Sequence, residues 1–201
     1  MEPWREAVWR AVPEDARPER FAARRALLLA HVRPGDRVLD LGAGDGAFAA
    51  ELAAAGCAVV AVDVAQEALR RARARVPGLD ARLAPEDGPL PLDEDAVDVV
   101  WAGDVLEHVA DVTGLLAEVR RVLRWGGALV LTTPYHGRVS VAALALRGRL
   151  DAHFDPRADH LRFFTAATLR TLLADAGFAE IDLHAAGGPP LLRAAFHVVA
   201  R

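Results

Sequence analysis

The stretch VLDLGAGDGAF, residues Val38–Phe48, joins an apolar run to a helical pattern through a turn that is rich in glycine. Three glycines, Gly42, Gly44 and Gly46, occupy alternate positions of this turn. Because glycines lack side chains, they let the backbone turn sharply and let a ligand lie against the main chain. Open α/β sheets bind their ligands at such turns, at the carboxyl ends of parallel strands. The stretch therefore predicts an α/β fold with a ligand site at this turn.

Short, continuously apolar runs predict the buried strands of a parallel sheet. These runs are Val38–Leu41, Ala58–Val62, Val97–Trp101 and Ala128–Thr132. Apolar residues at helical spacing predict helices over Gly46–Ala55, Ala65–Val76, Val112–Arg124 and Thr165–Ala176. The alternation of strands and helices predicts a doubly wound sheet with helices on both faces and right-handed crossovers.

The two ends of the chain depart from this alternation. Ala179–His184 and Ala194–Ala200 predict two further strands, joined by a loop without a crossover helix. A pair connected in this way is antiparallel. Pro3–Val12 and Pro18–Val32 predict two helices ahead of the sheet, which we group as an N-terminal region, residues 1–33.

Length and composition indicate a single globular domain over residues 1–201, with 53% hydrophobic and 26% charged residues. The net charge of −4 argues against bulk nucleic acid as a partner. The apolar runs are far shorter than the roughly 20 residues that span a membrane. No secretory pattern opens the sequence, so we expect a cytoplasmic protein. The single cysteine, Cys57, lacks the companions of a disulfide or zinc site, and we expect no metal centre.

Acidic residues near the glycine turn bear on the class of ligand. Asp63 ends the second predicted strand, about 21 residues after Gly42, where a carboxylate accepts hydrogen bonds from ribose hydroxyls. That position suits a nicotinamide dinucleotide as well as other nucleosides. Asp40 favours a positively charged ligand, because Asp40 and Asp45 would repel a pyrophosphate. An oxidoreductase that binds NAD(P) stays open as an alternative.

Beyond the glycine turn, the chain resembles the class I S-adenosylmethionine-dependent methyltransferases, in particular small-molecule enzymes with LEH after the fourth strand. The motifs that carry the resemblance are LDLGAGDG (39–46), AVDV (61–64), APEDGPLPLDEDAVDVV (84–100), GDVLEHV (103–109), LLAEVRRVLRWGGALVLTTP (115–134) and HLRFFTAATLRTLLADAGF (160–178). The resemblance implies a Rossmann-like, seven-stranded sheet that is mostly parallel with an antiparallel last strand. It also implies methyl transfer from S-adenosyl-L-methionine to an oxygen, nitrogen or carbon atom of a small or medium organic acceptor, with S-adenosyl-L-homocysteine as product.

The resemblance further implies which residues contact the cofactor. The methionine part would meet the glycine turn, the ribose would meet Asp63, and the sulfonium would lie beside the end of the fourth strand. The adenine would meet Glu86 or Asp87, where many relatives have Gly-Asp-Ala instead. The full implied set is Asp40, Gly42, Ala43, Gly44, Gly46, Asp63, Val64, Glu86, Asp87, Gly103 and Asp104.

His108 is the candidate catalytic residue, because it follows the fourth predicted strand at the edge where reacting groups gather. Its imidazole suits proton removal from a hydroxyl or amine acceptor, or the positioning of that acceptor. Methyl transfer itself depends mainly on positioning and on exclusion of water. Further candidates for binding the acceptor are Tyr135, His136, His153 and His160. We expect the interval 135–164 and the N-terminal helices to cover the acceptor pocket.

Two acceptor classes are set aside. Residues Ala102–Val105 are AGDV, where enzymes that methylate amide or exocyclic nitrogens often have NPPY or DPPY. Cys57 precedes the second strand, so it lies at the wrong edge for a cytosine C5 nucleophile. A cofactor-binding module without turnover is a third interpretation, and the sequence predicts no oligomeric state.

Overall fold

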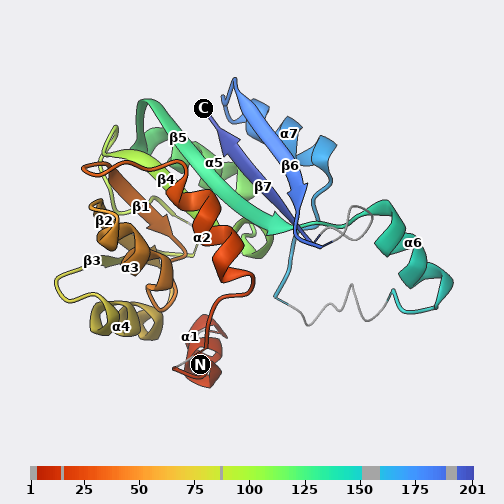
Figure 1. The fold of residues 1–201 in the computed structure, drawn as a ribbon, viewed down its shortest axis with the longest axis horizontal. Helices are drawn as coiled ribbons and strands as arrows, with labels where there is room; N and C mark the ends of the chain where they lie inside the picture. Colours follow the sequence, from red (N-terminus) through yellow and green to blue (C-terminus); the bar gives the residue numbers. More distant parts are fainter. Residues whose placement is uncertain (1–3, 15, 87, 151–158, 189–193) are drawn as a thin grey trace.

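The computed structural model describes residues 4–14, 16–86, 88–150, 159–188 and 194–201. A seven-stranded sheet runs through its centre, with helices packed on both faces (Figure 1). The strands are β1 (Arg37–Leu41), β2 (Ala58–Asp63), β3 (Asp80–Leu83), β4 (Val97–Gly103), β5 (Leu123–Pro134), β6 (Ile181–Ala186) and β7 (Ala195–Ala200).

The strand order is β3-β2-β1-β4-β5-β7-β6. Strands β3, β2, β1, β4 and β5 pair in parallel, whereas β7 pairs antiparallel with both β5 and β6. The last strand thus lies between its two partners rather than at the edge. This confirms the Rossmann-like, mostly parallel sheet and the antiparallel final pair.

The helices are α1 (Trp4–Ala11), α2 (Phe21–Leu29), α3 (Ala47–Ala54), α4 (Gln66–Arg75), α5 (Val112–Val122), α6 (Arg138–Leu146) and α7 (Ala166–Asp175), with a short 3-10 helix, η1 (Leu106–His108). Because side chains alternate along a strand, the sheet supports two cores. One contains Leu28 of α2 with Phe48 and Leu52 of α3. The larger core holds apolar residues of α5 and α7 against the opposite face.

Two elements differ from the sequence prediction. Strand β3, with the sequence DARL, was not predicted, because its polar residues sit on a mostly exposed edge. Helix α5 ends at Val122 and β5 begins at once with Leu123, which pairs with Val97. The predicted helix end at Arg124 and strand start at Ala128 are therefore wrong. A register shift between Val97 and Val99 accommodates the intervening, largely exposed residues.

The elements outside the alternation lie apart from the cores. Helix α1 has no buried residue and packs against α4. Helix α6 projects away from the sheet beyond the end of β5 (Figure 1). No helix in the described ranges is both long and apolar enough to span a bilayer.

Candidate active site

The carboxyl ends of three neighbouring strands, β2, β1 and β4, form one edge of the sheet. Asp40 lies at the end of β1, Asp63 ends β2 and Gly103 ends β4. Residues that are 63 positions apart in sequence are therefore collected at the carboxyl edge of the sheet. We call this region, around Asp40, Asp63 and Gly103, the crevice, because open α/β sheets bind their ligands there.

The glycine turn is fixed to β2 by its own backbone. The N–H groups of Gly42 and Ala43 both donate to the Val62 carbonyl, at 2.8 and 3.0 Å. Gly42, Gly44 and Gly46 have φ values of 67°, 56° and 78°, a left-handed conformation that glycine adopts without strain. The turn therefore requires glycine at these alternate positions.

Asp63 holds the turn from the neighbouring strand. Its carboxylate accepts hydrogen bonds from the backbone N–H of Gly44, at 2.9 Å, and of Ala65, at 3.0 Å. Burial raises the pKa of Asp63, and these N–H groups oppose the rise by stabilising the charged form. Asp63 thus joins β2, the glycine turn and the start of α4.

Asp40 is a deeply buried carboxyl of the crevice, with 1% of its surface exposed. Its Oδ2 has no hydrogen-bond partner among the residues that the structure describes. Burial, reinforced by the negative charge of Asp63, raises the pKa of Asp40 to about 7. A buried oxygen without a partner is costly, so this position favours a ligand that brings a donor or a positive charge.

Helix α1 covers the central glycine. A Cβ placed on Gly44 would lie 2.7 Å from the indole ring of Trp9, so the ring rests directly on the glycine turn. Arg5 donates to the backbone carbonyl of His108 at 2.9 Å. Helix α1 therefore contacts both the glycine turn that follows β1 and η1, which follows β4.

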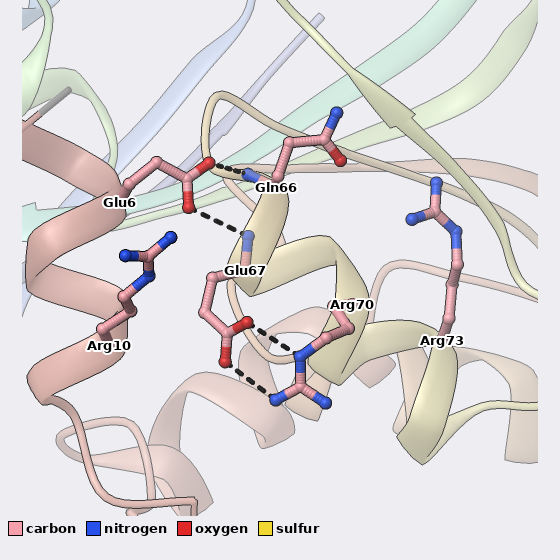
Figure 2. A pocket seen from close by; sticks show the side chains of 6 residues that line it. All are labelled: Glu6, Arg10, Gln66, Glu67, Arg70 and Arg73. Carbon is pink, nitrogen blue, oxygen red and sulfur yellow. Dashed lines mark hydrogen bonds and ion pairs between the residues drawn. The ribbon is translucent and has the colours of Figure 1, made fainter. Parts of the chain in front are cut away.

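A pocket of about 530 Å³ lies beside this covering helix, between α1 and α4 (Figure 2). The Glu6 carboxylate accepts from the backbone N–H groups of Gln66 and Glu67 at the start of α4. Glu67 pairs with Arg70 at 2.8 Å. The acidic groups of the pocket are thus engaged within it, and neither Asp63 nor a residue of the glycine turn lines it.

A buried arginine, Arg24 of α2, borders the end of β4, and the sequence analysis did not identify it. Its guanidinium pairs with Asp104 at 3.1 Å and lies 4.9 Å from the centre of the Phe48 ring. A Cβ on Gly103 would come within 2.4 Å of this guanidinium, so Gly103 is small because Arg24 passes over it. The signal that could have found Arg24 is its place in α2, FAARRALLL, where it and Arg25 interrupt the apolar residues.

Asp104 is a non-glycine residue with a left-handed φ of 55°. The Thr132 hydroxyl donates to its carboxylate at 2.6 Å, and Arg20 lies 3.7 Å away. Asp104 therefore follows the end of β4 with its charge already paired to arginines.

Next to Asp104, η1 places a buried carboxyl beside two imidazoles. Glu107 is 1% exposed, and burial, with a contribution from the Asp104 charge, raises its pKa to about 7. The rings of His108 and His160 lie 4.8 Å apart. Burial lowers the pKa of His108, which keeps the imidazole neutral near pH 7. The structure thus brings together His108 and His160, which the sequence analysis predicted separately. Glu107 joins them, although the sequence analysis did not single it out within the LEH motif.

The remaining predicted residues are more dispersed. Tyr135 follows β5 and packs edge-on against Phe196, with ring centres 5.0 Å apart. His136 contacts Phe163 in the same manner, at 5.1 Å. Glu86 is exposed after β3, and Val64 is half-buried after β2. Asp87 and His153 lie outside the described residues.

With this geometry established, comparison with known proteins identifies the family. A family model described as "Methyltransferase domain" matches residues 14–183. The chain belongs to this methyltransferase family. The match confirms the resemblance to S-adenosylmethionine-dependent methyltransferases and favours it over the nicotinamide alternative.

The names of curated relatives of the methyltransferase domain agree with this family. It is 35% identical over 156 residues to a probable S-adenosylmethionine-dependent methyltransferase of Mycobacterium tuberculosis, covering 78% of this chain and 53% of the relative. A protein of the same description from Mycolicibacterium smegmatis is 36% identical over 163 residues, covering 79% and 60%. This chain therefore spans little more than half the length of these relatives.

Solved structures support the fold. The putative methyltransferase in a complex with the Haloferax volcanii Trm112 methyltransferase activator superposes with a TM-score of 0.76 at 21% identity, covering 100% of this chain and 98% of that one. An S-adenosylmethionine-dependent methyltransferase from Mesorhizobium loti has a TM-score of 0.69 at 25% identity, with 94% and 100% covered.

The raised pKa of Asp40 predicts a pH-dependent stability for the methyltransferase domain. Native Asp40 keeps its proton up to about pH 7, whereas an unfolded chain loses it near pH 4. At Asp40 the unfolded state therefore binds fewer protons across this window, and the contribution of Asp40 to the free energy of unfolding falls as the pH rises from 4 to 7. Asp40→Asn should remove about 2–4 kcal/mol of that decline.

The measurement is urea unfolding of both proteins at several pH values. Each keeps the other charged groups near this position, Asp63, Asp45 and Arg24, so the difference between the two curves isolates Asp40. Curves that stay parallel from pH 4 to 7 would contradict the predicted burial of this carboxyl.

Proposed function

We propose that the chain binds S-adenosyl-L-methionine in the crevice at the ends of β2, β1 and β4 and transfers its methyl group to a small or medium organic acceptor. The observation that carries the proposal is the unpartnered, buried Oδ2 of Asp40 beneath the glycine turn. When bound, S-adenosyl-L-methionine supplies an activated methyl group on a positively charged sulfur, for which a carboxyl-lined crevice is suited.

The residues of the crevice fit the parts of this cofactor. The glycine turn leaves backbone exposed to a ligand once the Trp9 ring moves, since the ring contacts Gly44. Asp40 would accept hydrogen bonds from the amino group of the methionine part, and Asp63 would accept from the ribose hydroxyls. Gly103 and Asp104 would border the sulfur, and Glu86 or Asp87 would meet the adenine.

His108 is the proposed residue on the acceptor side. Its Nδ1 donates to the carbonyl of Asp159 at 2.9 Å, which leaves the lone pair on Nε2. That nitrogen can take a proton from a hydroxyl or amine acceptor, or position the acceptor. His160 lies against the same ring and joins it on this side.

The acceptor pocket is proposed to be covered by the interval 135–164 together with the N-terminal helices. Large apolar side chains of this interval are exposed, namely Val139, Leu146, Leu150, Leu161 and Phe163. Exposed apolar side chains grouped in one segment favour contact with a ligand or another surface. Tyr135 and His136 begin the segment and would contact the acceptor.

Calorimetric titration tests the proposed function. We expect S-adenosyl-L-homocysteine to bind with micromolar affinity and NAD and NADP not to bind. Binding of a nicotinamide dinucleotide without S-adenosyl-L-homocysteine would overturn the proposal. A mass-shift screen of candidate acceptors for one added methyl group then separates an enzyme from a module that only binds the cofactor.

His108→Ala should lower turnover by about 10²-fold or more, because it removes the Nε2 lone pair from the acceptor side. The affinity for S-adenosyl-L-homocysteine should stay within about twofold of the original, since His108 is assigned no cofactor contact. The control is His184→Ala, which removes an exposed imidazole on β6. Equal turnover in the two variants would remove His108 from the reaction.

A further inference from the structure

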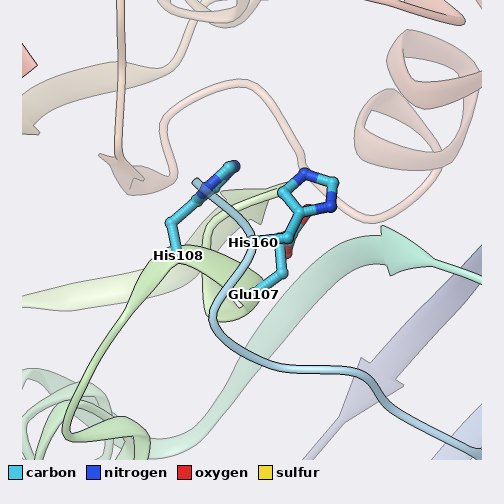
Figure 3. Close-up of side chains that lie close together, drawn as sticks. All are labelled: Glu107, His108 and His160. Carbon is cyan, nitrogen blue, oxygen red and sulfur yellow. The ribbon is translucent and has the colours of Figure 1, made fainter. Parts of the chain in front are cut away.

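One cluster at the end of β4 has the composition of a metal site. Glu107 and His108 come from η1, and His160 comes from the segment that leads to α7 (Figure 3). One potential ligand atom from each residue lies within 4.8 Å of the other two. His160 lies 52 positions after His108, so the fold itself brings it to the other two residues.

Glu107 offers a free oxygen to this cluster. Its Oε2 accepts a hydrogen bond from the Thr133 hydroxyl at 3.0 Å. Its Oε1 is buried and has no hydrogen-bond partner within the described part of the chain. Because the side chain is 1% exposed, water does not readily supply the missing partner. The position therefore favours a cation or a donor close to Oε1.

The imidazole of His108 is oriented as metal-binding histidines are. Its Nδ1 donates to the Asp159 carbonyl at 2.9 Å, and the Asp159 carboxylate is 3.4 Å away. Histidines that bind metals with one ring nitrogen commonly donate the other N–H to a carbonyl or carboxylate, which fixes the ring and its tautomer. Nε2 is thereby left as the coordinating atom, and in the ion-bound protein it acts on the acceptor through the ion rather than by taking a proton itself.

The segment that carries His160 is fastened to η1 by the backbone. The N–H groups of Leu161 and Arg162 donate to the Glu107 carbonyl, at 2.7 and 3.0 Å. The Arg162 guanidinium also bonds the carbonyl of Ala110. The third ligand is therefore held beside the other two before any ion binds.

We propose that Glu107, His108 and His160 bind one divalent first-row transition cation. Two imidazoles and one carboxylate are ligands suited to such ions and leave other coordination positions open. Ligand atoms about 2.1 Å from one ion lie up to about 4.2 Å apart, so the cluster has to close by roughly half an ångström. The nearby guanidinium of Arg24 is neutralised by Asp104 at 3.1 Å.

The open positions give the cation a role in the proposed methyl transfer, and this part of the inference rests on that proposed function. An ion held by η1 at the end of β4 adjoins the acceptor side of the crevice. It would bind oxygen atoms of the acceptor and favour their deprotonated form. The class of acceptor indicated is one with an oxygen donor, such as a hydroxyl beside a second oxygen.

The test is calorimetric titration of the tag-free chain with ZnCl₂, without added cofactor. We expect one ion per chain, with affinity lowered at least about tenfold in Glu107→Gln and in His160→Ala. His184→Ala is the matched control. It disrupts a surface pair in which the His184 and His197 rings lie 5.7 Å apart. The control should bind zinc as the unaltered chain does.

Three outcomes would each overturn the metal site. They are zinc binding that survives in both Glu107→Gln and His160→Ala, zinc binding that is lost in His184→Ala, and the absence of one-to-one zinc binding by the unaltered chain. Circular dichroism melting and S-adenosyl-L-homocysteine titration of the same variants show whether they fold and whether the cofactor crevice is intact. Zinc loss with unchanged S-adenosyl-L-homocysteine affinity supports the metal site. Failure of the unaltered chain to bind S-adenosyl-L-homocysteine would instead count against the proposed function alone.

Discussion

Asp40→Ala is expected to raise the dissociation constant for S-adenosyl-L-homocysteine at least about 100-fold, close to complete loss of binding. The variant removes a buried carboxyl that is 1% exposed, together with the acceptor at its unpartnered Oδ2. Truncating one partner of a buried, charged hydrogen bond costs 2–5 kcal/mol or more, and about 2.7 kcal/mol corresponds to 100-fold in affinity. Calorimetric titration measures the change directly.

Two comparisons give this result its meaning. Asp182→Ala, at an exposed position of β6, should bind as the unaltered chain does. Asp40→Asn keeps the shape of the side chain and removes its charge. It should therefore weaken S-adenosyl-L-methionine and S-adenosyl-L-homocysteine to a similar extent, because both carry the amino group assigned to Asp40. Unchanged binding by a folded Asp40→Ala protein would place the cofactor elsewhere.

Gly46→Ala should lower the free energy of unfolding by about 2–5 kcal/mol. Gly46 has a φ of 78°, and an added Cβ would lie 2.9 Å from the Cα and Cβ of Ala72 in α4. A methyl group at this position would contact the backbone of α4, which cannot move aside easily. The left-handed conformation adds strain for an alanine. Urea denaturation measures the loss, which is a large part of the roughly 5–15 kcal/mol that stabilises an ordinary domain.

Gly78→Ala is the matched control, because Gly78 has a φ of 81° and nothing within 4 Å of an added Cβ. It should carry the backbone strain alone, about 1–2 kcal/mol. The difference between the two variants measures how closely the start of α3 packs against α4. Equal losses would mean that this contact contributes nothing.

The repeating part of the fold could be predicted from the sequence because its signals are local. Buried parallel strands are continuously apolar, so β1, β2 and β4 are evident as short runs. Strand β3 has the sequence DARL and depends on pairing with β2 for its structure. The start of β5 depends likewise on the contact of Leu123 with Val97. Pairing with a neighbouring strand determines both β3 and the start of β5, and a local sequence pattern does not show which strands pair.

The same division applies to the candidate site. The glycine turn and Asp63 lie within short motifs, and the Asp63 contact with Gly44 spans only 19 residues. Arg24, Trp9 and the approach of His160 to Glu107 depend on contacts between distant parts of the chain. His160 was predicted as a separate acceptor contact, because sequence spacing does not reveal which histidines meet. These residues became evident only once the sheet edge was assembled.

The indole of Trp9 on Gly44 has a kinetic consequence. A ligand that lies against the central glycine must displace this ring. Moving α1 exposes no buried residue of that helix, but it breaks the hydrogen bonds of Arg5 and Glu6. Capture of the cofactor would then proceed in two stages, a rearrangement of the amino-terminal helix and an encounter with the uncovered turn. At high ligand concentration the observed association rate should level off at the rate of that rearrangement, and the fluorescence of Trp9 would report it.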